Sequence, residues 1–429
     1  MPDSLQDWLA FIESRHSQSI ALGLERVKTV STALSQRKTC TVIVVGGTNG
    51  KGSVCAMLES IISSAGYRVG LYTSPHLLRY NERVRTDRGQ ASDEELCQAF
   101  AAVEAARGDV PLTYFEYGTL AAWQVFAIAD VDVIILEVGL GGRLDAVNIY
   151  DADCAVVTTV DLDHMDFLGN DREQIGYEKA GIFRSATPAI CGDANPPATL
   201  LQHAHSVSAN LKLIGRDFGF IRQEQQWQFW DWRGKRSGLA HPALRGGVQL
   251  ANASVALAAL DSVEKKLPVA MQDIRRGLME VELPGRFQVI AGKPTVVLDV
   301  AHNPQAATVL AQNLGNMQFH LETWAIFGIM ADKDIVGVIR AINSRVDKWL
   351  VCALPGTRAA TAIKLKEMLQ TEGVNQLIYE FASPAKALGH ALGHATEADR
   401  IVVFGSFLTV ADAMTVLAPA FASKPDHHA

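Results

Sequence analysis

A glycine-rich stretch early in the sequence, TVIVVGGTNGKGSV at residues 41–54, has the residue types that bind phosphate groups. Backbone N–H groups at a helix start, the Lys51 ammonium and the Ser53 hydroxyl suit the phosphates and magnesium ion of a nucleotide. The spacing departs from the common pattern G-x-x-x-x-G-K-[ST], because Gly52 separates Lys51 from Ser53 and Val45 replaces the first glycine. The β-branched run before the glycines and the helical pattern after them favour a phosphate loop over a glycine turn without a ligand.

Polar side chains follow three other segments that we interpret as buried strands. Glu137 ends VDVIILE, Ser74 follows YRVGLYT, and His164 closes CAVVTTVDLDH. Ligands of parallel sheets bind outside the carboxyl ends of the strands, so we interpret Glu137 as a magnesium ligand rather than a loop cap. The Ser74 hydroxyl is a second candidate. Magnesium prefers oxygen ligands, so His164 is equally well explained as a structural hydrogen-bonding residue.

Four more residues are candidates for the same chemistry. Lys179 lies near the end of the helix expected at YEKAGIF, where the local residues alone indicate an exposed or ion-paired lysine. LDVAHNP places Asp299 at a strand end and His302 at the next helix start, and Arg286 lies in the turn-rich segment before them. These three groups could contact a nucleotide bound at the phosphate loop. Equally, Asp299 could cap the helix and Arg286 could form a surface ion pair.

The segments that must position these residues alternate between strands and helices, which predicts an α/β fold with parallel sheets. Two helices are expected within residues 4–37, before the phosphate loop. The turn-rich segment ELPGRFQVIAGKP predicts a boundary between two domains. We expect an N-terminal P-loop-type parallel-sheet ATPase domain at residues 1–286 and a smaller C-terminal Rossmann-like α/β domain at residues 287–429. Strands of the second domain are expected at TVVLDV, TWAIFGI, KWLVCAL and IVVFGS.

Residues 211–248 differ from the rest, because RQEQQWQFWDWRGKR is polar and aromatic with partial alternation. This pattern predicts a β-hairpin. Trp227, Trp230 and Trp232 lie beside arginines and could stack on nucleic-acid bases. Proteins that bind nucleic acid are usually basic, whereas this 429-residue chain has a net charge of −7. Aromatic pairs between exposed neighbouring strands therefore explain these residues better.

The composition limits the classes of protein further. Hydrophobic residues make up 48% of the chain, which is enough for a large core. The six cysteines form no C-x-x-C pair, which argues against a zinc site or a disulfide framework. No apolar run approaches the roughly 20 residues of a membrane span, and the N-terminus has no signal-like core. We therefore expect a cytoplasmic enzyme with no nucleic-acid and no membrane partner.

Ten motifs, in order along the chain, resemble those of the folylpolyglutamate synthases within the Mur ligase superfamily, and especially of their bacterial bifunctional dihydrofolate synthase members. The match runs from about residue 5 to residue 415, and the family shares the extra glycine of the phosphate loop. The motifs are GGTNGKGS, TSPHL, FEYGT, EVGLGGRLDA, LDH, EKAGIF, NAS, PGRF, DVAHNP and GSF.

The resemblance implies an ATP-dependent ligase. ATP would phosphorylate a carboxylate of dihydropteroate or of a reduced folate, and the amine of L-glutamate would then displace the phosphate. It also implies a monomer and two Mg²⁺ sites, the first held by Ser74 and Glu137 and the second by Glu137 and His164. Lys179 matches the family's carbamylated lysine.

The resemblance and the reasoning above together give three sets of site residues. The expected catalytic residues are Lys51, Glu137, His164 and Lys179. The expected ATP contacts are Gly47, Thr48, Asn49, Gly50, Lys51, Gly52, Ser53, Asn252, Arg286, Asp299 and His302. The expected dihydropteroate and folate pocket comprises Ile20, Ala21, Leu22, Thr113, Tyr114, Phe115, Glu116, Leu144, Asp145 and Ala146. In that pocket Tyr114 and Phe115 would cover the flat face of the pterin, and Glu116 would accept from its N–H groups.

Two positions depart from the family pattern. Ala21 in IALGLERV stands where bifunctional members usually have aspartate, which removes a possible polar contact to dihydropteroate. Val147 in RLDAVN replaces a threonine, and we expect a mild effect. Three competing interpretations remain. A peptidoglycan-building Mur ligase would need a further domain before Thr41, a P-loop kinase or switch NTPase would not need glutamate, and a non-catalytic nucleotide-binding protein would not need Glu137.

Overall fold

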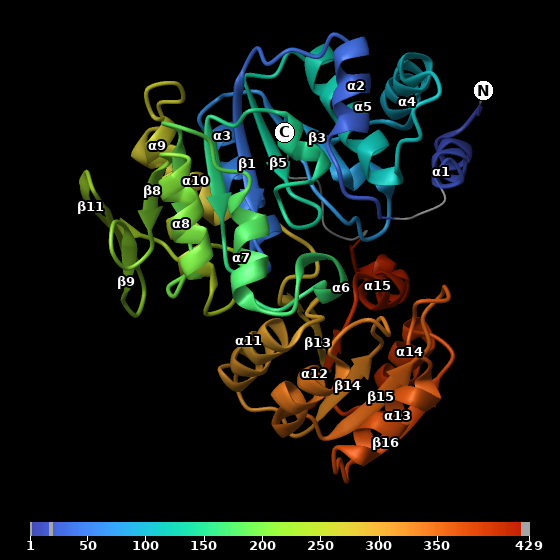
Figure 1. Cartoon of the computed structure of the whole chain (residues 1–429). Coiled ribbons are helices and arrows are strands. Elements are labelled where there is room, and N and C mark those ends of the chain that lie inside the picture. Colours follow the sequence, from blue (N-terminus) through green and yellow to red (C-terminus); the bar gives the residue numbers. More distant parts are fainter. Residues whose placement is uncertain (1, 17–19, 422–429) are drawn as a thin grey trace. The chain divides into compact units, whose positions relative to one another are not determined.

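The computed structural model describes residues 2–16 and 20–421, with side chains described as far as residue 417. The chain divides into two compact units (Figure 1). The first comprises Met1–Ala243 and Gln249–Glu282, and the second comprises Leu244–Val248 and Leu283–Ala429. Within the described residues, no helix combines the length and apolar character needed to cross a membrane.

The first unit is built on an eight-stranded sheet with the order β4-β3-β2-β5-β1-β6-β7-β8. The strands from β2 to β8 along this order are parallel, and β3 and β4 add an antiparallel edge. Val45 pairs with Glu137, so Glu137 lies beside the start of the glycine loop. The strands are β1 Thr41–Gly46, β2 Val69–Tyr72, β3 Val84–Thr86, β4 Gly89–Gln90, β5 Val133–Glu137, β6 Cys154–Val157, β7 Pro188–Cys191 and β8 Asn210–Leu213.

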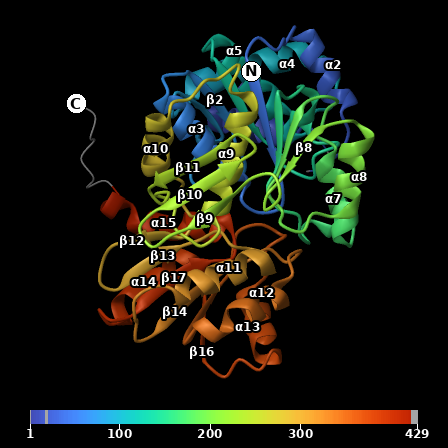
Figure 2. The same ribbon diagram turned by 90° about the vertical axis from the view of Figure 1, so that its left-hand side faces the viewer.

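Helices cover the sheet in distinct groups (Figures 1 and 2). α3 packs against α9 and α10, α4 packs against α5, and α7 packs against α8. Val42 and Val44 of β1 share one core cluster with Phe100 of α4 and Trp123 of α5, because alternate strand residues face one side. The helices are α1 Leu5–Glu13, α2 Glu25–Ala33, α3 Lys51–Ser64, α4 Asp93–Arg107, α5 Tyr114–Ile128, α6 Met165–Leu168, α7 Arg172–Ala180, α8 Ala198–Ser206, α9 Gln249–Val263 and α10 Met271–Glu280, with 3-10 helices η1 Tyr80–Arg83 and η2 Ala146–Ile149.

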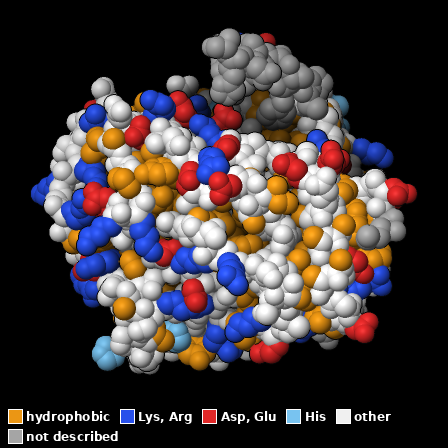
Figure 3. All heavy atoms as spheres, turned by 90° about the horizontal axis from the view of Figure 1, so that it is seen from above, with side chains coloured by type: hydrophobic (Ala, Val, Ile, Leu, Met, Phe, Trp, Pro, Cys, Tyr) orange, Lys and Arg blue, Asp and Glu red, His pale blue; other side chains and the backbone are white. Residues whose placement is uncertain are grey.

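The expected hairpin is a three-stranded antiparallel sheet of β9 Gly219–Arg222, β10 Trp227–Asp231 and β11 Gly234–Leu239. Trp227 is fully buried, and its indole N–H donates to the Ala240 carbonyl at 2.9 Å. Arg236 pairs with Asp261 of α9. These contacts show that Trp227 is a packing group, whereas Trp232 is exposed. On the face in Figure 3, acidic and basic side chains are interspersed.

The second unit contains a six-stranded sheet with the order β12-β13-β17-β14-β15-β16, parallel except for β12. Its core includes Phe327, Trp349 and Phe404, whose rings contact one another. The strands are β12 Gln288–Ile290, β13 Thr295–Leu298, β14 Thr323–Phe327, β15 Lys348–Cys352, β16 Leu377–Phe381 and β17 Arg400–Phe404. The helices are α11 Pro304–Gly315, α12 Ile335–Ile342, η3 Asn343–Arg345, α13 Ala362–Thr371, α14 Pro384–His394 and α15 Phe407–Phe421.

The boundary between the units differs from the one expected after residue 286, because the second unit begins at Leu283 and also includes Leu244–Val248. The Gly285 carbonyl accepts from the Val300 N–H at 2.9 Å, and the Phe287 N–H donates to Asp299 at 2.8 Å. The Gly247 N–H donates to the Asn313 side chain at 3.0 Å. These bonds attach both segments to the second sheet and its helices.

Candidate active site

The glycine loop joins β1 to α3 and approaches its neighbours too closely for larger residues. Gly47 and Gly50 have φ angles of 138° and 91°. A Cβ at Gly47 would lie 1.9 Å from the Thr158 hydroxyl, and one at Gly50 would lie 2.7 Å from the Asn252 side-chain oxygen. Glycine is therefore required at both positions. The same geometry brings Asn252 of α9 to the loop, as its expected role requires.

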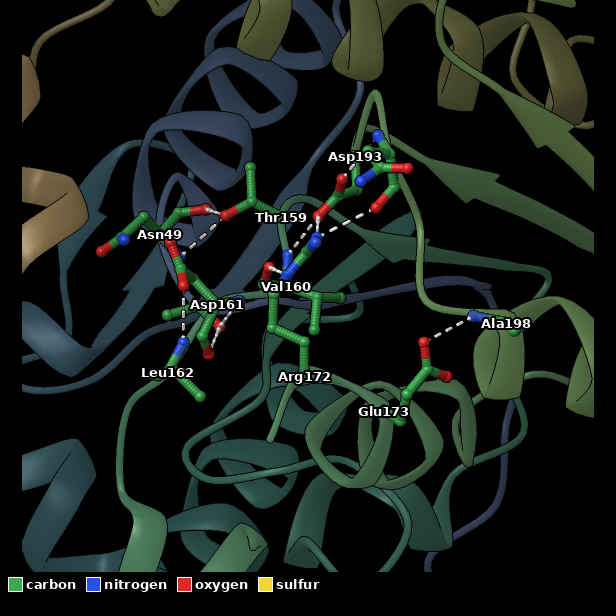
Figure 4. A network of polar contacts seen from close by, with 11 residues as sticks. Asn49, Thr159, Val160, Asp161, Leu162, Arg172, Glu173, Asp193 and Ala198 are labelled. Atoms are coloured by element: carbon green, nitrogen blue, oxygen red, sulfur yellow. Dashed lines mark hydrogen bonds and ion pairs between the residues drawn. The ribbon is translucent and has the colours of Figure 1, made fainter. Parts of the chain in front are cut away.

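Hydrogen bonds hold the loop against the segment after β6 (Figure 4). The Thr48 N–H donates to the Thr159 carbonyl at 2.7 Å, and the Asn49 N–H donates to the Thr159 hydroxyl at 3.2 Å. The Asp161 N–H donates to the Thr48 hydroxyl at 3.0 Å. Lys51 extends back over the loop, and its ammonium donates to the carbonyls of Gly47 and Thr48, both at 3.1 Å. The loop backbone is thus fixed, and the positive charge of Lys51 lies over the loop.

A second layer of contacts supports that segment and was missed by the sequence reasoning. Asp193, just after β7, accepts from the Val160 N–H at 2.7 Å and from Arg172 at 3.1 Å (Figure 4). Arg172 also donates to the Val160 carbonyl at 2.9 Å. Val160 lies between Thr159 and Asp161, which hold the glycine loop. The available signal was Asp193 itself, a carboxylate beyond the end of a buried strand.

Glu137 and Ser74 lie together at the carboxyl ends of neighbouring strands. Glu137 is the last residue of β5 and is only 5% exposed. Its carboxylate accepts from the Ser74 N–H at 3.2 Å. The Glu137 carboxylate and the Ser74 hydroxyl are oxygen ligands of the kind that magnesium prefers.

His164 lies at the same end of the sheet, on the segment after β6. It adopts a left-handed conformation with φ 51° immediately before the short helix α6. The His164 backbone N–H donates to the Asp163 carboxylate at 2.9 Å, and the ring nitrogen Nε2 of His164 lies 3.9 Å from the other oxygen of that carboxylate. Among the described residues no group of three or more His, Cys, Asp or Glu side chains is arranged to hold a metal ion.

Lys179 is buried rather than exposed. It lies in the last turn of α7 and is 4% exposed, so the interpretation as a surface or ion-paired lysine is wrong. Burial and, to a smaller extent, the nearby positive charge of Lys51 lower the pKa of Lys179 to about 7, although Asp163 and Asp145 partly oppose this shift. A large fraction of the Lys179 amine is therefore neutral, and hence nucleophilic, near neutral pH.

The three stretches expected to form the acceptor pocket meet in the first unit. Arg26 of α2 donates to the Ala21 carbonyl at 2.6 Å and to Glu116 at 3.0 Å. The Gly23 N–H donates to the Leu144 carbonyl at 3.4 Å. Residues 20–22, 113–116 and 144–146 are therefore brought together, although long stretches of sequence separate them.

Two acidic residues of this group are bound by protein atoms. Glu116 forms a capping box with Thr113 at the start of α5 and pairs with Arg26, so both of its oxygens accept hydrogen bonds. Asp145 accepts from the Leu140 and Val147 N–H groups and thereby shapes the glycine loop after β5. Burial raises the pKa of Asp145 to about 7. Glu116 therefore binds Arg26 and the Thr113 N–H, and its expected contact with a pterin stays a prediction.

The candidate residues of the second unit form their own cluster. Asp299 accepts from the N–H groups of Phe287 and Ala301, both at 2.8 Å. Asn303, not Asp299, caps α11, so the capping alternative for Asp299 is wrong. The Arg286 guanidinium carbon lies 5.0 Å from the centre of the Phe407 ring, and the centre of the His302 ring lies 6.3 Å from the centre of the same Phe407 ring. Burial raises the pKa of Asp299, and the charge of Arg286 opposes that rise.

Comparison with known families defines the class of protein. Family models of the Mur ligase middle domain and of the Mur ligase glutamate ligase domain match residues 45–260 and 285–407. The Escherichia coli dihydrofolate synthase/folylpolyglutamate synthase is 45% identical over 414 residues, covering 96% of this chain and 95% of the relative. The Haemophilus influenzae protein of the same name is 40% identical over 433 residues, covering 96% and 97%.

Solved structures agree with this classification. E. coli FolC in complex with DHPP and ADP has a TM-score of 0.93 at 44% identity, covering 98% of this chain and 100% of that chain. A bifunctional folylpolyglutamate synthase/dihydrofolate synthase with Mn, AMPPNP and L-glutamate bound has a TM-score of 0.90 at 43% identity, covering 97% and 98%. The chain therefore belongs to the dihydrofolate synthase/folylpolyglutamate synthase family.

Proposed function

We propose that this chain is an ATP-dependent ligase that adds L-glutamate to dihydropteroate, forming dihydrofolate, and to reduced folates, forming folylpolyglutamates. The observation that carries this proposal is the placement of Glu137 and Ser74 beside a phosphate loop, in a chain related to such enzymes over its full length. The acceptor stretches, which meet in the same unit, support it.

The proposed reaction has two steps. The acceptor carboxylate attacks the γ-phosphorus of ATP, giving an acyl phosphate and ADP. The amine of L-glutamate then attacks the acyl carbon, phosphate leaves, and an amide and a proton are formed. Both steps bring anions together, so positive charge must be available where they meet. Lys51 and the N-terminus of α3 supply such charge at the glycine loop.

A divalent metal ion belongs to this proposal, and the donor types fit Mg²⁺. Ser74 and Glu137 would hold one ion, and Glu137 and His164 would hold a second. Bound there, Mg²⁺ would neutralise phosphate charge during transfer. Asn252, Arg286, Asp299 and His302 remain proposed ATP contacts.

Carbamylation of Lys179 is part of the same proposal. Carbon dioxide adds to a neutral amine, which loses a proton and becomes a carbamate anion. Burial and the low pKa of Lys179 favour this reaction, because they keep the amine unprotonated. A carbamate at Lys179 would also place a negative charge near Lys51, whereas a protonated Lys179 would repel Lys51.

The proposal is tested by phosphate release from ATP by the purified chain, with and without L-glutamate and with each acceptor in turn. Release should require glutamate together with dihydropteroate or tetrahydrofolate, and a UDP-muramyl acceptor should give none. Release without glutamate would indicate a simple NTPase. A second candidate, a folylpolyglutamate synthase alone, is favoured by Ala21 and predicts activity on tetrahydrofolate only. We expect a monomer, which sedimentation would check.

A further inference from the structure

Arg83 has an environment that no step above uses. It is the last residue of η1 and is partly exposed. Its guanidinium carbon lies 5.3 Å from the centre of the Tyr80 ring and 5.5 Å from that of Tyr114. Its Nε donates to Nδ1 of His76 at 2.9 Å. The terminal nitrogens of the guanidinium make no hydrogen bond to any part of the chain that the structure describes.

The positive charge of Arg83 also lacks a partner carboxylate. Within residues 2–16 and 20–421, no Asp or Glu oxygen lies at ion-pairing distance from Arg83. Its neighbours differ, because Arg79 pairs with Asp93 at 2.9 Å and Arg85 pairs with Glu59 at 3.1 Å. The adjacent Glu82 carboxylate is bound by the backbone N–H groups of residues 77–79. A half-buried arginine with aromatic neighbours and free donors is suited to bind an anion from solution.

The position of Arg83 links two parts of the candidate site. Its carbonyl accepts from the Thr73 N–H at 2.9 Å, next to Ser74. Its guanidinium lies against Tyr114, which belongs to the acceptor stretch 113–116. The buried hydroxyl of Tyr80 lies beside Gly118, which belongs to α5 as Tyr114 does. The backbone of Arg83 thus holds the segment before Ser74, and an anion at its guanidinium would lie beside the start of the acceptor stretch.

The two proposed acceptors differ in their carboxylates. Dihydropteroate has one carboxylate, which is the group that becomes activated. A folate keeps an α-carboxylate beside the γ-carboxylate that is activated. We propose that Arg83 binds this α-carboxylate, with the pterin of the folate lying away from Tyr114, and so selects acceptors that already carry glutamate. The inference rests on the proposed function and extends it to a specificity-determining residue.

The test compares both acceptors in the Arg83→Gln and Arg83→Lys variants. Loss of a hydrogen bond to a charged group is expected to raise the KM for tetrahydrofolate roughly 10- to 100-fold in Arg83→Gln. The KM values for dihydropteroate and ATP should change less than about threefold, and Arg83→Lys should restore part of the loss. Arg79→Gln is the matched control, because it removes an exposed arginine next to η1, and it should leave both acceptors unaffected.

A substrate variant makes the test independent of folding. Tetrahydrofolate with its α-carboxylate replaced by a carboxamide should show the same rise in KM with the unmodified enzyme. It should show no further rise with Arg83→Gln, because enzyme and substrate changes remove one interaction. An equal loss for both acceptors, or full activity on the carboxamide, would overturn the inference. If the unmodified enzyme ligates glutamate to neither acceptor, the proposed function fails instead.

Discussion

Glu137 has one structural contact in the fold and one proposed catalytic role. Its carboxylate anchors the Ser74 N–H, and its buried negative charge lies beside the glycine loop. An amide of the same shape could keep the hydrogen bond but not the charge. The two roles can therefore be separated by a single substitution.

Glu137→Gln is expected to leave the fold intact and to lower the turnover number at least 100-fold, since one charge at a proposed metal ligand is lost. Phosphate release at saturating Mg²⁺ measures the effect, and circular dichroism checks the fold. Near-normal turnover of a folded Glu137→Gln protein would remove Glu137 from the catalytic residues.

Lys179 gives a pH-dependent prediction. Its pKa is about 7 in the folded state, lower than the ordinary value for lysine, so above pH 7 the unfolded state binds more protons. Stability relative to Lys179→Met should therefore rise with pH above 7, by about 1.4 kcal/mol per unit, until the ordinary lysine pKa is reached. Urea midpoints in carbon dioxide-free buffer measure this rise.

Bicarbonate provides the second measurement on Lys179. If carbon dioxide binds the folded protein at this amine, added bicarbonate should raise the urea midpoint of the unmodified protein but not that of Lys179→Met. Equal shifts in both proteins would contradict carbamylation at Lys179.

At the scale of elements, sequence patterns predicted most of the fold. The β-branched runs gave β1, β5, β13 and β17. The strands β3, β4, β7 and β8 of the first unit and β12 and β16 of the second were not predicted. β12 has three residues and the edge strand β16 is largely exposed, so neither has a buried apolar pattern. Local patterns also could not show that Arg26 binds Glu116, since such pairs form only when distant elements pack.

Asp193→Ala tests whether the segment after β6 positions the glycine loop. It removes the partner of Arg172 and leaves the Val160 N–H without its acceptor. We expect a loss of about 3 kcal/mol in stability and a raised KM for ATP. Glu173→Ala is the control, because among the described residues the Glu173 carboxylate accepts hydrogen bonds from the start of α8 and not from the segment after β6 (Figure 4). It should lower stability by about 1 kcal/mol without changing the KM for ATP. Equal KM effects in both variants would contradict the positioning role.

At the scale of the whole molecule, the central question is whether one site can use both dihydropteroate and reduced folates. Arg26 fixes the backbone of Ala21, so a longer side chain at position 21 would start from a defined place beside the acceptor stretches. The three stretches that the sequence predicted for the pocket lie together in the structure, and their binding of an acceptor stays a prediction. The sequence did not predict that Glu116 and Asp145 are bound by protein atoms, because those bonds depend on the packed structure.

Ala21→Asp is expected to lower the KM for dihydropteroate by roughly tenfold, the value of one hydrogen bond to a charged group. The KM for tetrahydrofolate should change less, since a folate has further contacts. Steady-state kinetics with both acceptors measure the difference. If the unmodified chain uses only tetrahydrofolate and Ala21→Asp restores nothing, the chain is a folylpolyglutamate synthase alone.

The proposed reaction depends on an acyl phosphate intermediate, and transfer of an oxygen isotope tests this intermediate most directly. Dihydropteroate labelled with ¹⁸O in its carboxylate is incubated with the enzyme, ATP, Mg²⁺ and L-glutamate, and the released phosphate is analysed by mass spectrometry. The account predicts one ¹⁸O atom in each phosphate, because the acceptor oxygen leaves with the phosphoryl group. Unlabelled phosphate, released while the amide product accumulates, would contradict it.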